Sequence, residues 1–381
     1  MGIIYYLSAI AKYIKEIFYL HWSSRTPLES EGALPFKVIN LKLSFFPLLI
    51  HKSFGGVSMI FRSINFTLLN NEVKCFFESD LKKILKNYAS TGESVFIFER
   101  PMGITLLKTV SECPKILRAH NFEKHFHLEG GPLSKLINNT ICGHLEEDFV
   151  SQCDLIFGIT KEEINSMSEE YSIPLEKFVW IPCPIDINSI RLISEKEKEK
   201  AKEELGLGNK KTAIFIGSGS YQNQIYCVPI IQKLAKNYPN IQFLIVGNVS
   251  KFFTPSHNLL LFGYVSDEKK RMLLSSADVA LNPVKTGSGM NIKMLEYLAH
   301  GVPVITTFKG MRGFSLRDGI DVFVASTERD FNDLISKFAN DELPLEKVRK
   351  NARRLIEKEY SFEVVGKRAF LAIKKVYEKY Y

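Results

Sequence analysis

The sequence lacks the features that would classify it at a glance. Its 381 residues contain no internal repeat and no low-complexity tract. They also contain no run of the ~20 consecutive apolar residues that a membrane-spanning helix needs. The six cysteines form no C-x-x-C pair and show no metal-type spacing. These absences argue against membrane-spanning, repeat, zinc-binding and disulfide-stapled proteins, and they favour a reduced, cytoplasmic chain whose thiols are structural.

Positive charge exceeds negative charge only modestly. The chain has 50 Lys and Arg residues against 42 Asp and Glu residues, which gives a net charge of +8. The basic residues are spread along the chain, so they fit an anionic small molecule or a membrane surface, and we expect no nucleic-acid partner. A hydrophobic content of 45% is typical of a soluble globular protein. The length predicts two domains, each large enough for its own core.

The opening segment through Leu20 is apolar, but charged side chains at Lys12, Lys15 and Glu16 interrupt it. It shows no convincing secretory signal. Its aliphatic residues recur at intervals of three and four, which predicts an amphipathic helix: Ile3, Leu7, Ile10, Ile14 and Ile17. We expect this helix to pack on a sheet, and peripheral contact with the inner face of a membrane remains an alternative.

Short β-rich runs alternate with helical segments in both halves. In the first half we expect strands at 36–43, 73–77, 94–98, 115–119, 154–159 and 178–181. In the second half we expect them at 213–216, 242–246, 259–262, 279–282, 302–306 and 322–325. Helices are expected at 228–237, 268–275, 291–300 and 328–339, with two more between 345 and 381. This alternation predicts α/β domains with parallel, doubly wound sheets, which bind ligands at the carboxyl ends of their strands.

The most informative stretch, 281–314, reads as a strand, a glycine loop, a helix and a second strand. Gly287, Ser288 and Gly289 allow the backbone to approach a ligand closely. The helix that starts near Met290 or Asn291 directs its first free N–H groups into that loop, which predicts an anion site.

Two charged residues of that helix, Lys293 and Glu296, are three positions apart and are expected to share its exposed face. A cation and a carboxylate beside a phosphate site suit a nucleotide diphosphate. The alternative is an ordinary solvated ion pair on the helix surface.

Two further strand ends could contribute to the same site. The strand 213–216 empties into a loop that holds Gly217 and Ser218, whose small side chains would expose backbone N–H groups to an anion. Tyr264 follows the strand 259–262, where backbone groups could support a nucleotide base. An ordinary turn explains the second feature equally well.

In the first half, polar residues follow the strand 115–119. His120, Asn121 and Glu123 cluster at its carboxyl end, where an α/β domain collects functional groups. His125 and His127 follow closely, so a metal site is an alternative. The spacing of these histidines suits a strand, and no cysteine or carboxylate cluster completes a ligand set, so we expect no metal.

Taken together, these motifs resemble the family 4 retaining glycosyltransferases. The second half carries IFIGSGSYQNQ (214–224), FLIVGN (243–248), LFGYVSDEKKRMLLSSADVALNP (261–283) and GSGMNIKMLEYLAHGVPVITTFKGMRGF (287–314). The first half carries RAHNFE (118–123), CDLIFGIT (153–160) and VWIPCPID (179–186), and YSFEVVGKRAFLAIKKVY (360–377) resembles the family's C-terminal helix. The resemblance covers about 94 to the end.

The resemblance implies the GT-B fold, which has two Rossmann-like, doubly wound domains facing each other across a cleft. The acceptor-side domain would be 1–190, with 362–381 packing back on it, and the donor-binding domain would be 191–361. His120 corresponds to a histidine near the transferred sugar, with Asn121 and Glu123 on the acceptor side. The donor would be bound by ten residues: Glu296 (ribose), Lys293, Gly287, Ser288, Gly289, Met290, Asn291, Gly217, Ser218 and Tyr264.

The chain departs from the family in two places. Relatives often have a second glutamate where this chain has Ser288, so a sugar-hydroxyl contact usually made by that glutamate is missing. The Arg and Lys pair that usually follows the first strand of the donor domain is also absent, because 217–224 (GSGSYQNQ) holds neither. Lys293, with Lys285 or Arg312, would then have to balance the diphosphate.

We therefore expect a glycosyltransferase that moves a sugar from a nucleotide diphosphate sugar to a glycan, glycolipid or lipid-linked acceptor. Retention is implied by the resemblance, and we expect no cofactor besides the nucleotide sugar as co-substrate. Two alternatives stay open: a nucleotide-sugar epimerase of the same fold, and a non-catalytic partner subunit.

Overall fold

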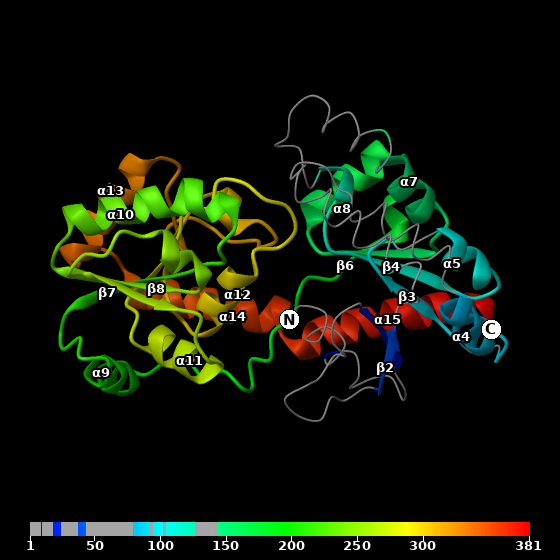
Figure 1. Ribbon diagram of the computed structural model, residues 1–381, viewed down its shortest axis with the longest axis horizontal. Coiled ribbons are helices and arrows are strands. Elements are labelled where there is room, and N and C mark those ends of the chain that lie inside the picture. The colour runs from blue at the N-terminus through cyan, green and yellow to red at the C-terminus, as the bar shows by residue number, and fades with distance from the viewer. Residues whose placement is uncertain are drawn as a thin grey trace. The chain divides into compact units, whose positions relative to one another are not determined.

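The structure is a computed structural model that describes residues 9, 18–23, 37–42, 79–91, 94–101, 104–125, 140 and 143–381 (Figure 1). The chain forms two compact units. The first contains the described residues up to Pro184 together with Ser288–Met290 and Phe362–Tyr381. The second contains Ile185–Gly287 and Asn291–Ser361. The expected strand at 73–77 and His127 lie outside the described residues.

The first unit is built on a four-stranded sheet in which every neighbouring pair of strands is parallel. Its order is β3 (Phe96–Glu99), β4 (Lys115–Ala119), β5 (Leu155–Gly158) and β6 (Phe178–Trp180). The helices of this unit are α4 (Ser79–Ala89), α5 (Ile104–Thr109), α7 (Gly143–Ser151), α8 (Lys161–Glu170) and α15 (Phe362–Tyr380). A short helix, η1 (Glu123–His125), follows β4.

Alternate residues of these strands supply two separate cores. Leu117 and Ile156 pack with α5, α7 and α8, while their neighbours Ile116 and Leu155 pack with the apolar side of α15. Because successive side chains of a strand point to opposite faces, helices cover both faces of the sheet. The last helix of the chain is therefore part of the first unit's core.

A separate two-stranded parallel sheet joins β1 (Phe18–Ser23) to β2 (Lys37–Lys42). The strand β2 confirms the strand expected at 36–43. The expectation for the start of β1 was wrong, because we placed 18–20 in the opening helix. The segment FYLHWS is rich in aromatic residues, which favour strands, and pairing with β2 outweighs the helical spacing of the residues before it.

The second unit contains a six-stranded parallel sheet in the order β12-β11-β10-β7-β8-β9. The strands are β7 (Lys211–Ile216), β8 (Ile241–Val246), β9 (Leu259–Gly263), β10 (Val279–Asn282), β11 (Val304–Thr306) and β12 (Phe323–Val324). The helices are α9 (Glu195–Glu204), α10 (Val228–Asn237), α11 (Asp267–Ser275), α12 (Ile292–Ala299), α13 (Glu328–Ala339) and α14 (Leu345–Tyr360). Every strand expected between 213 and 325 is present.

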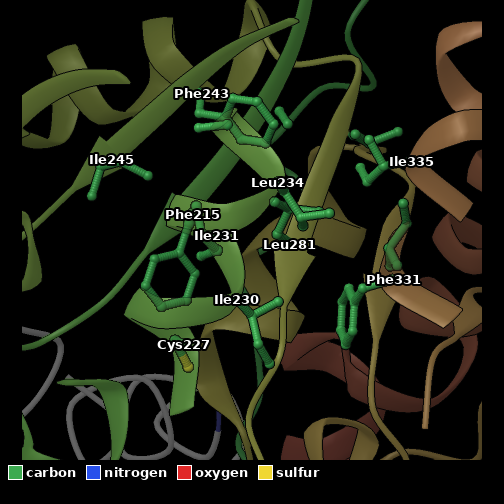
Figure 2. Packing of buried hydrophobic residues seen from close by; sticks show 14 of the residues in the cluster. Phe215, Cys227, Ile230, Ile231, Leu234, Phe243, Ile245, Leu281, Phe331 and Ile335 are labelled. Carbon is green, nitrogen blue, oxygen red and sulfur yellow. The ribbon is translucent and has the colours of Figure 1, made fainter. Parts of the chain in front are cut away.

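The core of the second unit lies between its sheet and two helices. Phe215, Phe243 and Leu281 point from neighbouring strands toward α10 and α13, which contribute Ile231 and Phe331 (Figure 2). Figure 1 shows α10 and α13 on one side of this sheet and α9 and α11 on the other. Most residues of these strands are apolar and buried, which is why the sequence located the strands accurately.

Helix ends are fixed by local sequence. Ser266 and Thr327 cap α11 and α13 by accepting hydrogen bonds from backbone N–H groups three residues later. Helix α12 ends at Gly301, which has a φ of +71° that only glycine adopts without strain.

Candidate functional site

The strand order of the second sheet changes direction beside β7. The chain runs from β7 outward to β8 and β9, and then returns to place β10 on the opposite side of β7. At such a switch point the loops that follow the two central strands run in opposite directions. A crevice therefore opens at the carboxyl ends of these strands. The loops here are 217–220, after β7, and 283–290, after β10. These are the two glycine loops that the sequence singled out.

The first loop depends on close backbone packing at Gly217. Its amide donates to the carbonyl of Val246 (2.9 Å), and its carbonyl accepts from Val249. A Cβ on Gly247 would lie only 2.3 Å from the Gly217 carbonyl oxygen, and Gly247 has a φ of +94°. The side chain of Asn223 holds the Ser218 carbonyl at 2.8 Å, which leaves the Ser218 side chain exposed.

The second loop leads into α12, and buried amides hold it. Asn282 donates to Thr306 Oγ1 (3.0 Å) and to the Gly310 carbonyl (3.2 Å), and Asn291 donates to the same carbonyl (3.0 Å). The side chain of Asn291 is therefore not used to cap α12, although Asn291 occupies the N-cap position. No side chain of the N-cap residue therefore blocks the first N–H groups of α12. Tyr297 links the helix to β7, because its hydroxyl accepts a hydrogen bond from the Ile216 amide (2.7 Å).

Lys293 does not lie on an exposed helix face, contrary to our expectation. Its Nζ atom is buried, has no hydrogen-bond partner in the described part of the chain, and lies 4.6 Å from the centre of the Phe215 ring. Burial lowers the pKa of Lys293 from 10.5 to about 8; Cys227 opposes this effect and Arg312 adds to it. Burial also raises the pKa of the Cys227 thiol to about 11, so that thiol is not an anionic partner at neutral pH.

Glu296 faces a different partner. Its Oε1 accepts a hydrogen bond from Lys270 Nζ on α11 at 3.1 Å, and the two side chains are 15% and 19% exposed. Although burial lowers the pKa of Lys270, the carboxylates of Glu296 and Asp267 raise it overall. Within the described contacts Lys293 and Glu296 form no ion pair, so the alternative of a solvated pair on α12 is wrong.

The remaining donor-side residues are less enclosed. Gly287 has a φ of +118°, and a Cβ there would lie 3.0 Å from Nη2 of Arg312. Arg312 Nη1 in turn donates to the Lys309 carbonyl (3.2 Å), which places its guanidinium beside the loop. Lys285 is exposed, and Tyr264 is 88% exposed after Gly263, whose φ is +64°.

The tip of the second loop, Ser288–Met290, belongs to the first compact unit. There Ser288 Oγ donates to Asn121 Oδ1 (3.3 Å), and the Gly289 amide donates to Glu163 Oε1 (2.7 Å). We expected the Gly289 amide to face a phosphate, but in this structure it donates to the carboxylate of Glu163. Met290 is buried beside it.

His120 lies at the carboxyl end of β4, next to Glu99 at the end of β3. Their closest atoms, Nε2 and Oε2, are 2.5 Å apart, and Arg118 Nη1 lies 2.9 Å from the same oxygen. Burial lowers the pKa of His120, and Arg118 and Arg100 add to this effect while Glu99 opposes it. Burial alone would raise the pKa of Glu99, but Arg118 and His120 hold it below its usual value.

Glu123 is buried in the helix η1, which a neighbouring carboxyl group anchors. Glu146 accepts hydrogen bonds from the amides of Glu123 and Lys124 (both 3.0 Å) and from the Tyr171 hydroxyl (2.8 Å). Burial raises the pKa of Glu146 to about 8; the hydrogen bonds from the two amides and from Tyr171 oppose this effect, and the negative charge of Glu123 adds to it. The side chains of Glu146 and Tyr171 therefore fix the backbone that follows His120 and Asn121.

Neither a metal centre nor a membrane span is found among the residues that the structure describes. No group of three or more His, Cys, Asp or Glu residues in that part of the chain is arranged to hold an ion. None of its helices is both long and apolar enough to cross a bilayer. The cysteines described there, Cys113, Cys153, Cys183 and Cys227, are buried and form no disulfide.

Comparison with protein families now identifies the second unit. Residues 210–341, which include both glycine loops and all of α12, match the family described as Glycosyl transferases group 1. The chain is a glycosyltransferase. Comparison of this glycosyltransferase with curated protein sequences gives no match.

Solved structures confirm that the glycosyltransferase has the GT-B fold. Sucrose-phosphate synthase from Thermosynechococcus elongatus aligns with a TM-score of 0.70 at 12% identity, over 96% of this chain and 89% of that one. HepE (Alr3699) from Anabaena, solved with UDP and glucose, aligns with a TM-score of 0.66 at 13% identity, over 98% and 95%. WaaG, described as a glycosyltransferase of lipopolysaccharide biosynthesis, aligns with a TM-score of 0.62 at 16% identity, over 97% and 94%.

Sequence reasoning missed three charged residues that contact predicted site residues. Lys270 pairs with Glu296, Glu99 pairs with His120, and Glu163 binds the Gly289 amide. Glu99 could have been found, because a parallel register places the ends of β3 and β4 side by side and a carboxylate there must face Arg118. The contacts of Lys270 and Glu163 join segments that are far apart in the sequence, and no local sequence pattern reveals such contacts.

Proposed function

We propose that this glycosyltransferase uses a nucleotide diphosphate sugar as donor and transfers its sugar to a glycan, glycolipid or lipid-linked acceptor. The observation that carries the donor assignment is the buried ammonium of Lys293 at the switch point of the second sheet, which contacts the Phe215 ring but has no hydrogen-bond partner among the described residues. Retention of anomeric configuration and independence from metal ions follow from the resemblance and are part of the proposal.

An ammonium group without a partner is costly to bury, because its lost hydration is not replaced. A ligand that brings negative charge to the site would remove this cost. The open N–H groups of α12 and the guanidinium of Arg312 add positive potential next to Lys293. A diphosphate bears the negative charge that this arrangement lacks, and Lys293 and Arg312 would take the place of the missing Arg and Lys pair in 217–224.

Glu296 is suited to the ribose. Its Oε1 is held by Lys270, which orients the carboxylate, and its other oxygen has no hydrogen-bond partner among the described residues and can accept from a hydroxyl. A carboxylate can accept from two vicinal hydroxyls, which a ribose presents. Lys270 keeps the charge of Glu296 compensated when the site is empty.

The acceptor proposal rests on His120, Asn121 and Glu123 and on neighbouring structures. WaaG acts in lipopolysaccharide biosynthesis, and HepE has been solved with UDP-glucose. The basic excess of the chain is compatible with peripheral contact at a membrane where such lipid-linked acceptors reside. We propose that His120 bonds a hydroxyl of the transferred sugar.

Calorimetric titration of the full chain with UDP, GDP and ADP and their glucose conjugates tests the donor assignment. We expect one nucleotide to bind, and Glu296→Gln to weaken it at least tenfold, since one charge-assisted hydrogen bond is lost. The matched control is Glu342→Gln, an exposed glutamate of the same unit. Unchanged affinity in the Glu296 variant would rule out the ribose contact.

Turnover is then followed as nucleotide release with and without lipid-linked acceptors. Release that depends on an acceptor supports the transferase. Loss of donor with no acceptor present would indicate an epimerase or hydrolase instead.

A further inference from the structure

Two strands of the first unit bring three charged or titratable side chains together at their carboxyl ends. Parallel pairing places Glu99 of β3 directly beside Arg118 of β4, and His120 follows two residues later. Oε2 of Glu99 lies 2.9 Å from Nη1 of Arg118 and 2.5 Å from Nε2 of His120. The three side chains are 12%, 2% and 15% exposed, so water screens this cluster weakly.

We propose that Glu99 is a positioning residue that holds His120 as the Nε2–H tautomer, so that the unprotonated Nδ1 accepts a hydrogen bond from a sugar hydroxyl. This inference rests on the proposed function of His120. It adds the tautomer, the residue that selects it, and the direction of the hydrogen bond to substrate.

The tautomer follows from the roles that the atoms can play. An ionised carboxylate has only acceptor sites, so a contact of 2.5 Å with the Nε2 of His120 requires the proton to reside on that nitrogen. Arg118 donates to the same oxygen, and its charge favours the ionised form of Glu99. Nδ1 of His120 has no hydrogen-bond partner among the described residues.

The charge of the ring follows from its neighbours. The described charged groups that bear on His120 are Glu99 at the end of β3, Arg100 directly after it, and Arg118 from β4. Burial, together with two cations against one anion, disfavours a positive charge on the ring. A neutral ring presents a lone pair at Nδ1, so His120 would accept a hydrogen bond from a hydroxyl and would not donate a proton to a leaving group.

A spectroscopic experiment on the wild-type chain tests the tautomer without reference to catalysis. The protein is labelled with 15N-histidine, its ring nitrogens are recorded through two-bond couplings near pH 7.5, and His120 is assigned by its absence in His120→Gln. We expect a protonated Nε2 and an unprotonated Nδ1. An Nδ1–H tautomer, or an imidazolium, would overturn the proposal even if the chain transfers sugar.

Kinetics of Glu99→Gln, Arg118→Met and the exposed control Glu112→Gln test the consequence for the reaction. In the wild type we expect activity to fall in acid with a midpoint below 6.5, the ordinary value for imidazole. Arg118→Met should move this midpoint upward, because Glu99 then faces the ring without a competing cation. Glu99→Gln should lower kcat about tenfold and leave the donor KM unchanged, because the neutral amide replaces a charge-assisted hydrogen bond by a weaker one that no longer selects the tautomer.

A purely structural pair would give a different pattern. Both variants would then lower the melting temperature while the acid midpoint and kcat stayed at the values of Glu112→Gln, and that result would refute the proposal. If neither variant folds, the ring-nitrogen spectrum of the wild type still decides the tautomer. If the spectrum shows the expected tautomer but the chain transfers no sugar, the proposed function fails and the assignment of Glu99 stands.

Discussion

Replacing Lys293 by methionine should make the ligand-free protein more stable and the donor complex weaker. Methionine matches the length of the lysine stem and can pack on the Phe215 ring, but it carries no charge. Because Lys293 Nζ has no partner among the described residues, the substitution breaks no hydrogen bond there. Removing the charge therefore removes a cost to folding and a contribution to binding at the same time.

The size of the effect follows from the lowered pKa. The difference between 10.5 and about 8 corresponds to on the order of 3 kcal/mol of unfavourable free energy for the charged form in the folded state. Between pH 8 and 10.5 the unfolded chain binds more protons at this site than the folded chain, so stability rises with pH across that window. Below pH 8 the full cost is present, and Lys293→Met should remove it.

Two measurements check this reasoning. Thermal unfolding at pH 7 should show a melting temperature several degrees higher for Lys293→Met than for the wild type, and the gap should shrink toward pH 10.5. Calorimetry should show nucleotide affinity reduced by about tenfold or more. Lys347→Met, at an exposed position of α14, is the control. A less stable Lys293 variant, or one that binds nucleotide as the wild type does, would refute the argument.

Three further predictions address other parts of the molecule. His120→Ala should lower kcat more than it changes donor affinity in calorimetry, and wild-type turnover would limit His120 to a structural role. Gly247→Ala should destabilise the second unit by about 3 kcal/mol or more in urea unfolding, because its Cβ would lie 2.3 Å from the Gly217 carbonyl and its φ of +94° is strained for alanine. An unchanged unfolding midpoint would contradict this. Glu146→Ala leaves two amides and the Tyr171 hydroxyl without an acceptor, so unfolding should show a loss of about 2–4 kcal/mol. A loss under 1 kcal/mol would mean that water replaces the carboxylate.

The sequence predicted the second unit better than the first. Its six strands are mostly apolar because helices cover both faces, and its loops are marked by glycines whose positive φ values require them, such as Gly287 and Gly301. The segment FYLHWS resisted prediction because its strand depends on pairing with β2, a contact between distant parts of the chain.

The candidate site, too, could be predicted only in part from local sequence patterns. Gly217, Lys293, Glu296 and His120 could be selected from local patterns, since strand ends and helix starts determine where such residues fall. The surroundings of these four side chains could not be predicted in this way. Whether Lys293 points to solvent or into the protein depends on the space beside Phe215, and that space is set by tertiary packing.

The hydrogen bond from the Ile216 amide to the buried Tyr297 hydroxyl has a thermodynamic consequence. Ile216 is the last residue before the first glycine loop, and Tyr297 directly follows Glu296, so one bond of 2.7 Å links the strand end to the helix that carries the proposed ribose contact. Motion of α12 relative to β7 is thereby restricted before any ligand arrives. A nucleotide would meet groups that are already ordered, and little conformational entropy would be lost within this unit on binding. The loss of conformational entropy on donor binding should therefore be smaller here than at a site assembled from independent loops.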